Sequence, residues 1–426
     1  MDFPLIDKSW KKGMHTFDIV YPNLKYGGSY NLGMLIIYNL VNNLPDWICN
    51  RVFLDEGKIK SKIMGFTLQY ELDYYNFFKI LEANSIPKEK DRREEIIMAG
   101  GPFVNSSPEA LAEHIDILIM GDAEETLPKV LDAFGRKKDK QSFLAEVSAI
   151  KGVYVPGISK SPACAFVSDL DSAPYPYYQP LPIKLTKDYV FGESFLLEVE
   201  RGCPFGCKFC PMPGRGGVRH RSLDKIKEIV DKGISINRRK KVVLYTPSLV
   251  HPKRKDILRY LISKGLEFSV PAIRIEVADK ELLGLVKEGG QKTLTIAPEC
   301  NEGLRFKIGK PIRDKAYFKF VEWAAGLGFE KLKCYFMIGI PGQKDNDIDQ
   351  MIELIIKIRR IFSNSYISIN PFVPKPGTEL EKHIFDIKEI KRQGKALKKA
   401  LGSKGIDFKL PSAKAAERQW RLAHKK

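Results

Sequence analysis

Three of the chain's seven cysteines lie within eight residues, in the stretch ERGCPFGCKFC. Cys203, Cys207 and Cys210 have the spacing C-x-x-x-C-x-x-C. Three thiolates on one short loop can hold zinc or an iron–sulfur cluster. A structural zinc needs a fourth ligand, and the nearest candidate is His220 in GRGGVRHRS. A [4Fe-4S] cluster on three cysteines leaves one iron open to a small molecule, which is an arrangement suited to catalysis.

Strand and helix patterns alternate around these cysteines from residue 194 onward. Six strands are predicted, and each except the last precedes an amphipathic helix: SFLLEVE, KKVVLYTP, EFSVPAIRIE, KTLTIAPE, KLKCYFMIGIP and SYISINPFVP. Six repeats are fewer than the eight of a closed barrel, so the pattern predicts a partial (β/α)6 barrel of the TIM type. Function is expected at the carboxyl ends of its strands, and the cysteine loop leaves the first of them.

A separate α/β pattern precedes this region. Residues 1–150 contain five short apolar strands, FDIVYP, WICNRVFL, IMGFTLQ, EEIIMAGGP and DILIMGDAE, separated mostly by helical patterns. Such alternation predicts a doubly wound, Rossmann-like parallel sheet. Residues 151–190 are rich in Pro and Tyr and are predicted to be a linker packed on a surface. The barrel is then expected over 191–376, followed by a basic helical extension over 377–426.

Composition narrows the class of protein. The chain has 426 residues and 44% hydrophobic content, which is typical of a globular protein of two or three domains. It contains no apolar run of eighteen residues, and its first residues have no signal-peptide pattern, so we expect a cytoplasmic protein without a membrane partner. The remaining cysteines lie in apolar contexts and are expected to be buried, reduced thiols: Cys49, Cys164, Cys300 and Cys334.

Positive charge is concentrated near the end of the chain. The formal net charge is +18, and residues 382–426 carry fourteen Lys and Arg against four acids, a net +10. The stretch IKEIKRQGKALKKAL predicts an amphipathic helix with an apolar side formed by Ile387, Ile390, Leu397 and Leu401 and with lysines opposite. A localised basic surface favours a polyanion such as RNA or tRNA, and a solvated helix face is the alternative.

The cysteine spacing, with the aromatic Phe209 before the third cysteine, resembles the signature of the radical S-adenosylmethionine enzymes. The resemblance covers about residues 190–375. It implies that Cys203, Cys207 and Cys210 hold a [4Fe-4S] cluster whose open iron chelates S-adenosylmethionine. It also implies an external electron donor such as ferredoxin or flavodoxin, and reductive cleavage to a 5′-deoxyadenosyl radical that takes a hydrogen atom from a substrate.

The same resemblance implies cofactor contacts near the cysteine loop and at strand ends, by Phe209, Glu299, Gly339, Pro341, Phe372 and Val373. Glu299 in TIAPE is expected against the cofactor ribose, because a carboxylate can accept from two hydroxyls. Glycine in MIGIPG lets backbone approach the adenosyl group closely. Arg274 in PAIRIE is a charge flanked by apolar residues, so we expect it to point into the barrel and to pair with Glu299 or the cofactor carboxylate.

A second cofactor is implied by the preceding domain. Phrases such as AGGPFVNSSPEAL and GDAEE resemble the subclass of these enzymes that carries a cobalamin-binding domain. The subclass motif D-x-H-x-x-G is absent, since YPNLKYGGSYNLG contains neither histidine nor aspartate, while Gly100 and Gly101 match its later G-G pair. Three readings stay open: the domain binds cobalamin without histidine, binds another ligand, or only supports the barrel.

The leading hypothesis is therefore a radical enzyme that modifies a substrate, with RNA as the candidate and cobalamin-assisted methylation as one outcome. A methylthiotransferase is the second hypothesis, and it needs further cysteine ligands where the N-terminal region offers only Cys49 and Cys164. The third is a basic RNA-binding iron–sulfur protein without enzymatic activity.

Overall fold

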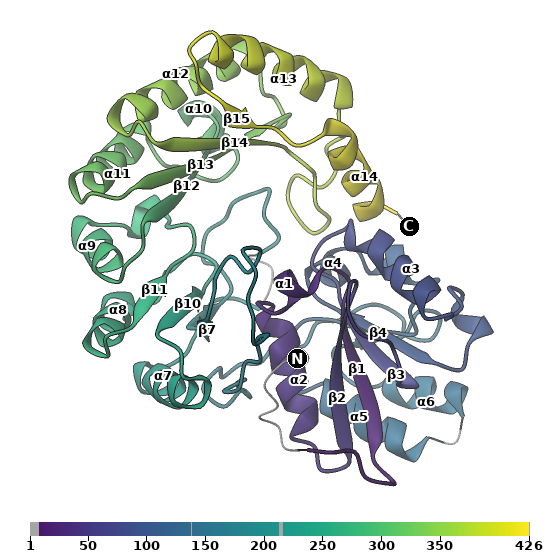
Figure 1. The fold of residues 1–426 in the computed structure, drawn as a ribbon. Coiled ribbons are helices and arrows are strands. Elements are labelled where there is room, and N and C mark those ends of the chain that lie inside the picture. The colour runs from purple at the N-terminus through teal and green to yellow at the C-terminus, as the bar shows by residue number, and fades with distance from the viewer. Residues whose placement is uncertain (1–7, 138, 213–215, 426) are drawn as a thin grey trace. The chain divides into compact units, whose positions relative to one another are not determined.

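The chain forms two compact units, each built on parallel β-sheet (Figure 1). The computed structural model describes residues 8–137, 139–212 and 216–425. The first unit comprises Met1–Leu196, Ile229–Arg239 and Leu422–Lys426. The second unit comprises Leu197–Glu228 and Lys240–Arg421.

A six-stranded sheet in the order β2-β1-β3-β4-β5-β6 forms the centre of the first unit. Its strands are β1 His15–Tyr21, β2 Trp47–Phe53, β3 Ile63–Thr67, β4 Ile96–Gly100, β5 Ile117–Ile119 and β6 Val153–Tyr154. The first five strands pair in parallel, and β6 joins β5 in the antiparallel sense. The predicted parallel α/β sheet is thus confirmed.

Helices cover both faces of this sheet. They are α1 Lys25–Gly28, α2 Leu32–Asn42, α3 Asp73–Ala83, α4 Pro102–Ser106, α5 Leu127–Arg136 and α6 Lys140–Val147. One core cluster joins α2, α5 and α6 to β1 and β2, and a second joins α3 and α4 to β3 and β4. The short apolar strands are buried because both faces are covered.

The sequence prediction missed two elements at the end of this unit. Helix α6 and strand β6 lie where a charged segment and a linker were expected, and β6 falls inside the predicted linker of residues 151–190. The rest of that linker is held on the first unit, as expected. Its Tyr175 hydroxyl donates to the Leu196 carbonyl at 2.7 Å, and the Asn39 side-chain amide of α2 donates to the Tyr178 carbonyl at 3.1 Å.

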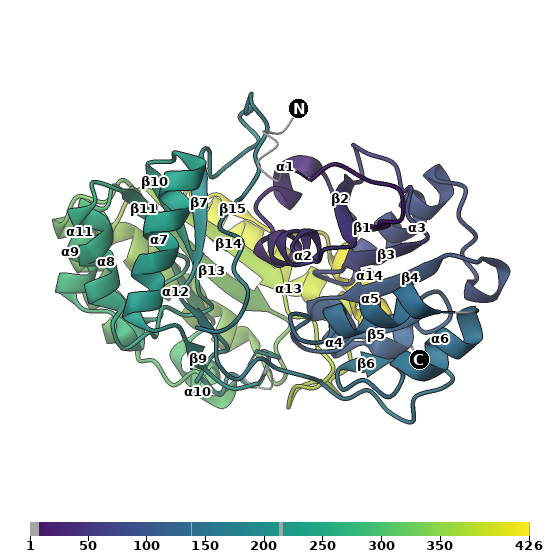
Figure 2. The same ribbon diagram turned by 90° about the horizontal axis from the view of Figure 1, so that it is seen from below.

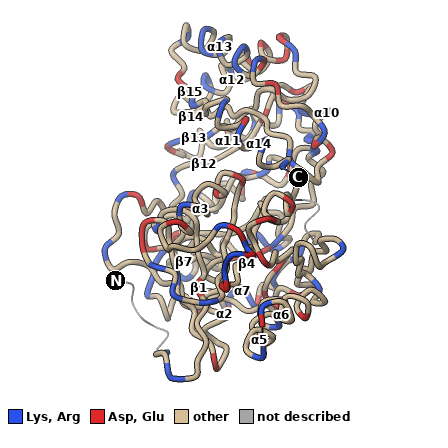
Figure 3. The backbone as a smooth tube through the Cα atoms, turned by 90° about the vertical axis from the view of Figure 1, so that its right-hand side faces the viewer, with Lys and Arg blue, Asp and Glu red and all other residues tan. Residues whose placement is uncertain are grey.

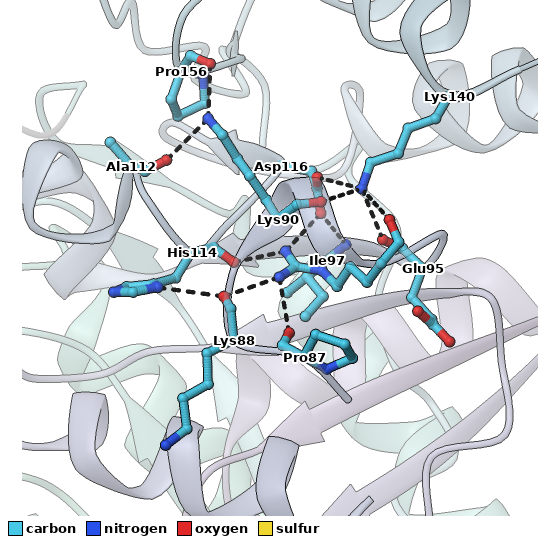
Figure 4. Close-up of polar contacts among 11 residues, drawn as sticks. Pro87, Lys88, Lys90, Glu95, Ile97, Ala112, His114, Asp116, Lys140 and Pro156 are labelled. Atoms are coloured by element: carbon cyan, nitrogen blue, oxygen red, sulfur yellow. Dashed lines mark hydrogen bonds and ion pairs between the residues drawn. The ribbon is translucent and has the colours of Figure 1, made fainter. Parts of the chain in front are cut away.

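A buried ion cluster fixes one end of the first unit (Figure 4). The Asp116 carboxylate accepts from the Arg93 guanidinium and the Ile97 N–H, both at 2.9 Å, and its other oxygen lies 3.0 Å from the Lys140 ammonium. The Asp116 and Arg93 side chains are fully buried. Lys140 also donates to the carbonyls of Lys90 and Arg93. The cluster therefore ties the segment before β4 to the start of α6.

The strands after the linker form two sheets and a short two-stranded ribbon. These strands are β7 Ser194–Glu198, β8 Glu200–Arg201, β9 Arg219–His220, β10 Lys241–Tyr245, β11 Glu267–Ser269, β12 Thr293–Glu299, β13 Lys331–Ile338, β14 Ser365–Pro371 and β15 Phe408–Lys409. The sheets have the orders β11-β10-β7 and β12-β13-β14-β15, and β8 pairs with β9. A single backbone bond from the Ile273 N–H to the Thr295 carbonyl bridges the two sheets.

Helices alternate with these strands as the sequence predicts. They are α7 Leu223–Asn237, α8 Arg254–Ser263, α9 Lys280–Glu288, α10 Glu302–Lys307, α11 Asp314–Gly326, α12 Asp345–Ile361, α13 Ile387–Gly402 and α14 Ala413–Ala423. Figures 1 and 2 show α8, α9 and α11 together on one side of the strands. Helix α13 is the predicted amphipathic helix, with Ile390, Leu397 and Leu401 buried, and α10, β15 and α14 were not predicted.

Two sequence expectations are wrong, one in the second unit and one in the first. The strand predicted over residues 267–276 ends at Ser269, and Arg274 lies beyond it, just before a single 3-10 turn, Ile275–Val277. Pro271 removes a backbone donor there, which interrupts the ladder. Cys164, expected to be buried, is exposed. Among the described residues, no helix is both long enough and apolar enough to span a membrane.

Candidate active site

A short antiparallel ribbon closes the cysteine loop. Glu200 pairs with His220 and Arg201 pairs with Arg219, so the chain returns to its starting point after the three cysteines. At the base of the loop, Gly202 has φ +83°, and a Cβ there would lie 1.9 Å from the Gly217 carbonyl oxygen. Only glycine fits such a position, because the left-handed conformation and the close backbone approach both exclude a side chain.

Charged side chains, most of them buried, pair with one another at this ribbon. Glu198 accepts from Arg201 at 2.7 Å and from the fully buried Arg221 at 2.9 Å. His220 Nδ1 lies 3.3 Å from a carboxylate oxygen of the buried Glu200, and its ring lies 4.9 Å from the ring of His251. The His220 imidazole is thus engaged with Glu200 and His251, which argues against its use as a fourth zinc ligand.

The three loop cysteines are chemically suited to hold an iron–sulfur cluster. None of them is in a disulfide; Cys207 is buried, and Cys203 and Cys210 are partly exposed. The guanidinium of Arg274 donates to Cys207 Sγ at 3.2 Å, and a cation at that sulfur stabilises a thiolate. Across the described ranges, no three His, Cys, Asp or Glu side chains are arranged as a preformed metal site. The fit therefore rests on the donor set and its cation, and the ligand roles are proposed below.

Arg274 contacts the cysteine loop. It does not pair with Glu299, which was one of the two partners expected from the sequence. Its guanidinium carbon lies 3.8 Å from the ring centroid of Phe205, and it forms an ion pair with Glu276. Burial lowers the pKa of Arg274, but hydrogen bonds to Glu276 and Cys207 outweigh burial and leave the pKa raised. Arg274 is a permanent cation beside the loop.

Glu299 ends β12 in a strained conformation and has a different partner. A register shift between Ile296 and Glu299 inserts an extra residue opposite β13, and Glu299 takes φ +67°. A non-glycine residue in this region costs about 1–3 kcal/mol and persists only where its surroundings hold it. The Lys310 ammonium holds Glu299, since it donates to its carboxylate at 2.8 Å and to the Ala297 carbonyl at 2.6 Å.

The turn that carries Lys310 also touches the cysteine loop. The Lys208 N–H donates to the Ile308 carbonyl at 3.0 Å. Gly309 has φ +75°, and a Cβ there would lie 2.3 Å from the Gly206 carbonyl oxygen. The segment 308–310 thus lies against the loop through Ile308 and Gly309 and against the carboxylate of Glu299 through Lys310.

An apolar cluster joins the cysteine loop to the ends of three strands. Its members are Cys300, Leu304, Ile308, Ile340 and Phe372, with Phe209, Met337 and Leu380 packed against them. Phe209 comes from the loop, and Cys300, Ile340 and Phe372 follow β12, β13 and β14. Burial raises the pKa of the Cys300 thiol to about 12, so this cysteine is a neutral core residue. Phe209 and Phe372, each expected from the sequence to contact the cofactor, thus belong to one apolar cluster.

The other predicted cofactor contacts are Gly339, Pro341 and Val373, and each lies in different surroundings. Gly339 has φ +74°, and a Cβ there would lie 2.6 Å from Ile390 of α13, so its missing side chain makes room for that helix. Gln393 of α13 accepts from the Gly339 N–H at 2.9 Å. Pro341 and Val373 are both partly exposed beside the apolar cluster residues Ile340 and Phe372.

Sequence reasoning missed the turn 308–310, although one signal was present. Gly309 in FKIGKP lies two residues after the end of α10, and a glycine just past a helix is a common helix C-terminal signal. The pairing of Lys310 with Glu299 depends on the bulge in β12, and the sequence carries no period that would reveal it.

Replacing Gly309 by alanine should loosen the cysteine loop, because the new Cβ would meet the Gly206 carbonyl. We expect a loss of at least about 1 kcal/mol in the stability of the second unit and a lower iron content after anaerobic reconstitution and gel filtration. Gly328→Ala is the matched control, since Gly328 has φ +73° but no atom within 4 Å of its Cβ position. Equal iron loss in both variants would show that the loop contact is unimportant.

The site thus combines a loop of three thiols closed by a ribbon, an adjacent arginine and a strand-end carboxylate. Two family models match the chain: residues 58–156 match "Radical SAM proteins, N-terminal" and residues 197–355 match "Radical SAM superfamily". The chain belongs to the radical S-adenosylmethionine superfamily, and it is an enzyme. Members of this superfamily use a [4Fe-4S] cluster and S-adenosylmethionine.

Relatives extend over most of the chain. An uncharacterized protein of Methanocaldococcus jannaschii is 33% identical over 395 residues, covering 91% of this chain and 84% of its own. An uncharacterized methyltransferase of Pyrococcus horikoshii is 27% identical over 67% of this chain and 62% of its own.

A solved structure has a similar fold. It is the cobalamin-dependent S-adenosylmethionine radical enzyme OxsB with aqua-cobalamin and S-adenosylmethionine bound, at a TM-score of 0.60 and 13% identity. The match covers 80% of this chain and 52% of OxsB, so this chain corresponds to about half of that protein.

Proposed function

We propose that this enzyme methylates RNA, with tRNA as the first substrate class to test, through radical chemistry at the cysteine loop. Cys203, Cys207 and Cys210 are the proposed cluster ligands, and the strands β7 and β10 to β14 are proposed to form a partial barrel around them. When bound, the cluster and S-adenosylmethionine supply an adenosyl radical that removes a hydrogen atom from the substrate. Ferredoxin or flavodoxin is the proposed source of the electron.

The observation that supports this site best is the apolar cluster shared by the cysteine loop and three strand ends. Phe209 and Phe372 form an apolar wall, and Glu299, held by Lys310, stands at the end of β12. These residues would exclude water from the adenine and accept from the ribose hydroxyls. Arg274 would orient Cys207 through the hydrogen bond to its sulfur. Pro341 and Val373 complete the proposed cofactor contacts.

Cobalamin is the ligand proposed for the first unit, bound without a histidine ligand. The strand order changes direction between β1 and β3, and ligands of such sheets bind at the carboxyl ends beside that point. Neither His15, which opens β1, nor His114, which precedes β5, lies at that edge. Gly101 has φ +112°, and a Cβ there would lie 2.5 Å from the Leu68 carbonyl oxygen, so this glycine also serves local packing. No reaction step is assigned to cobalt.

The RNA proposal is supported by a stripe of lysines on α13, which we name the α13 stripe: Lys388, Lys391, Lys395, Lys398 and Lys399. All five are exposed, and within the described residues none has an ion-pair partner. Glu389, the one acid of this helix, is already paired with Arg392. Figure 3 shows basic positions recurring along α13. A row of unpaired cations attracts a phosphate backbone.

Changing four of these lysines, Lys391, Lys395, Lys398 and Lys399, to glutamine should weaken RNA binding in a salt-dependent way. Losing up to four phosphate contacts should make the slope of log affinity against log salt shallower by up to about 3. The matched control changes Lys11, Lys12, Lys58 and Lys62, which are also exposed, to glutamine. If both variants lose affinity equally, the effect is one of net charge and the α13 stripe is not a binding surface.

The function itself is tested with the full chain, anaerobically reconstituted with iron and sulfide and reduced with dithionite. Bulk tRNA and S-adenosylmethionine are added with and without methylcobalamin, and the products are measured by mass spectrometry. We expect 5′-deoxyadenosine and S-adenosylhomocysteine, together with a methylated nucleoside in digested RNA. Formation of 5′-deoxyadenosine without any new nucleoside would contradict the RNA proposal but support the radical chemistry.

A further inference from the structure

One face of the sheet β12-β13-β14 is not covered by helices. Along β13, Leu332, Cys334, Phe336 and Ile338 are fully buried. The alternating residues on the opposite face are partly or wholly exposed: Lys331, Lys333, Tyr335 and Met337. We name this opposite side of the three strands the open face. The side chains of this face can reach a ligand, because they are partly or wholly exposed although β13 is an inner strand.

Strand register places two aromatic rings on the open face. Lys333 stands beside Tyr366 of β14 and beside Thr295 of β12, and Tyr335 stands beside Ser368. Tyr335 and Tyr366 are each 37% exposed, although both lie on strands with neighbours on either side. Exposed aromatic residues gathered at such a position mark a binding surface.

The ionisable side chains of the open face are all positively charged. Lys331 and Lys333 are its ionisable cations, and the alternating positions of the three strands on this face contain no acid. The Lys331 ammonium lies 5.3 Å from the ring centroid of Tyr366, and within the described residues Lys333 has no ion-pair partner. Asn370, which is partly exposed, adds a neutral hydrogen-bonding group. The face therefore suits a ligand that combines negative charge with flat aromatic groups.

The open face also leads to the cysteine loop. The strands are parallel, so the series that starts at Lys331 ends at Met337, which packs against the apolar cluster that includes Phe209. Six residues of a strand span about 20 Å, which is longer than a single nucleotide. A chain of two or three nucleotides could lie along the face with one end near the thiols.

We propose that the open face binds a single-stranded segment of the RNA substrate, with bases stacked on Tyr335 and Tyr366 and phosphates at Lys331 and Lys333. This inference rests on the proposed function and names how its substrate would be held. Stacking of a base on an aromatic side chain tolerates any sequence, so the partly exposed Asn370 is the group that could distinguish bases.

The test measures binding of a fluorescein-labelled single-stranded RNA 10-mer to the reconstituted full chain by fluorescence anisotropy. Tyr335→Leu should weaken binding by about fivefold to a hundredfold, the range for loss of one stacked base, while Tyr335→Phe should stay within about twofold. Tyr75→Leu, on the exposed face of α3, is the control and should not change affinity. Circular dichroism confirms that each variant is folded.

Three outcomes separate this inference from the proposed function. RNA binding that is the same in Tyr335→Leu, Tyr366→Leu and the parent chain would overturn the open face as the binding site and leave the RNA proposal intact. AMP that competes as well as the 10-mer at equal nucleotide concentration would overturn a multi-nucleotide segment. No binding of RNA by the parent chain, with 5′-deoxyadenosine still formed, would reject RNA as the substrate.

Discussion

Replacing Cys207 by alanine is expected to abolish formation of 5′-deoxyadenosine and to lower the iron content of the reconstituted protein. Cys207 is the buried member of the three loop cysteines, and its sulfur receives the hydrogen bond from Arg274. Two remaining thiolates cannot complete a set of three cluster ligands. The measurements are iron and sulfide content, and 5′-deoxyadenosine by mass spectrometry after reduction with dithionite.

Cys164→Ala is the control for this variant, because Cys164 lies outside the loop and is exposed. It should keep both iron content and activity. Arg274→Lys adds a graded case, since lysine retains the charge but loses the planar group that stacks on Phe205 and reaches Glu276. Full activity in Cys207→Ala would show that the loop thiols do not hold the cluster.

Replacing Asp116 by alanine is expected to destabilise the first unit by about 3–5 kcal/mol, the cost of leaving buried charges without their partner. Arg93 and Lys140 both depend on this carboxylate, and the Ile97 N–H would lose its acceptor (Figure 4). Asp116→Asn should cost less, because an amide oxygen can still accept from Ile97. Urea unfolding followed by the fluorescence of Trp47, buried in the core of the first unit, measures the change.

Asp132→Ala is the matched control for the buried cluster. Asp132 forms an ion pair with Arg136 whose side chains are 70% and 57% exposed. Exposed pairs contribute about 0–1 kcal/mol, so this variant should unfold close to the parent chain. A similar small change in Asp116→Ala would mean that the carbonyl oxygens around Lys140 and Arg93 satisfy those cations without the carboxylate.

The parallel sheet of the first unit and the strand–helix alternation of the second were predictable from sequence, because apolar runs of five to seven residues alternate with amphipathic helical periods. The strand over 267–276 was predicted too long, since its apolar run continues through Val270 to Ile273 and only Pro271 argues against pairing. Helix α6 was missed because its residues have a weak apolar period within a charged segment.

In the site, too, local sequence motifs were predictable, and contacts between residues distant in sequence were not. Phe209 next to Cys210 is a local motif that the sequence shows, whereas its packing against the cluster that contains Phe372 was not predicted. Arg274 was expected to meet an anion inside a barrel, yet it lies at Cys207, sixty-seven residues away in sequence. Lys310 was not considered, because only the bulge at the end of β12 turns Glu299 toward it. Contacts of this kind depend on backbone irregularities that no spacing rule describes.

The ribbon of β8 and β9 constrains both ends of the cysteine loop. Because Glu200 and Arg201 pair directly with His220 and Arg219, backbone bonds hold the two ends of the loop together. The core strands on either side belong to sheets that need no loop residue for their pairing. A substitution within the loop is therefore expected to change the site while leaving these sheets paired.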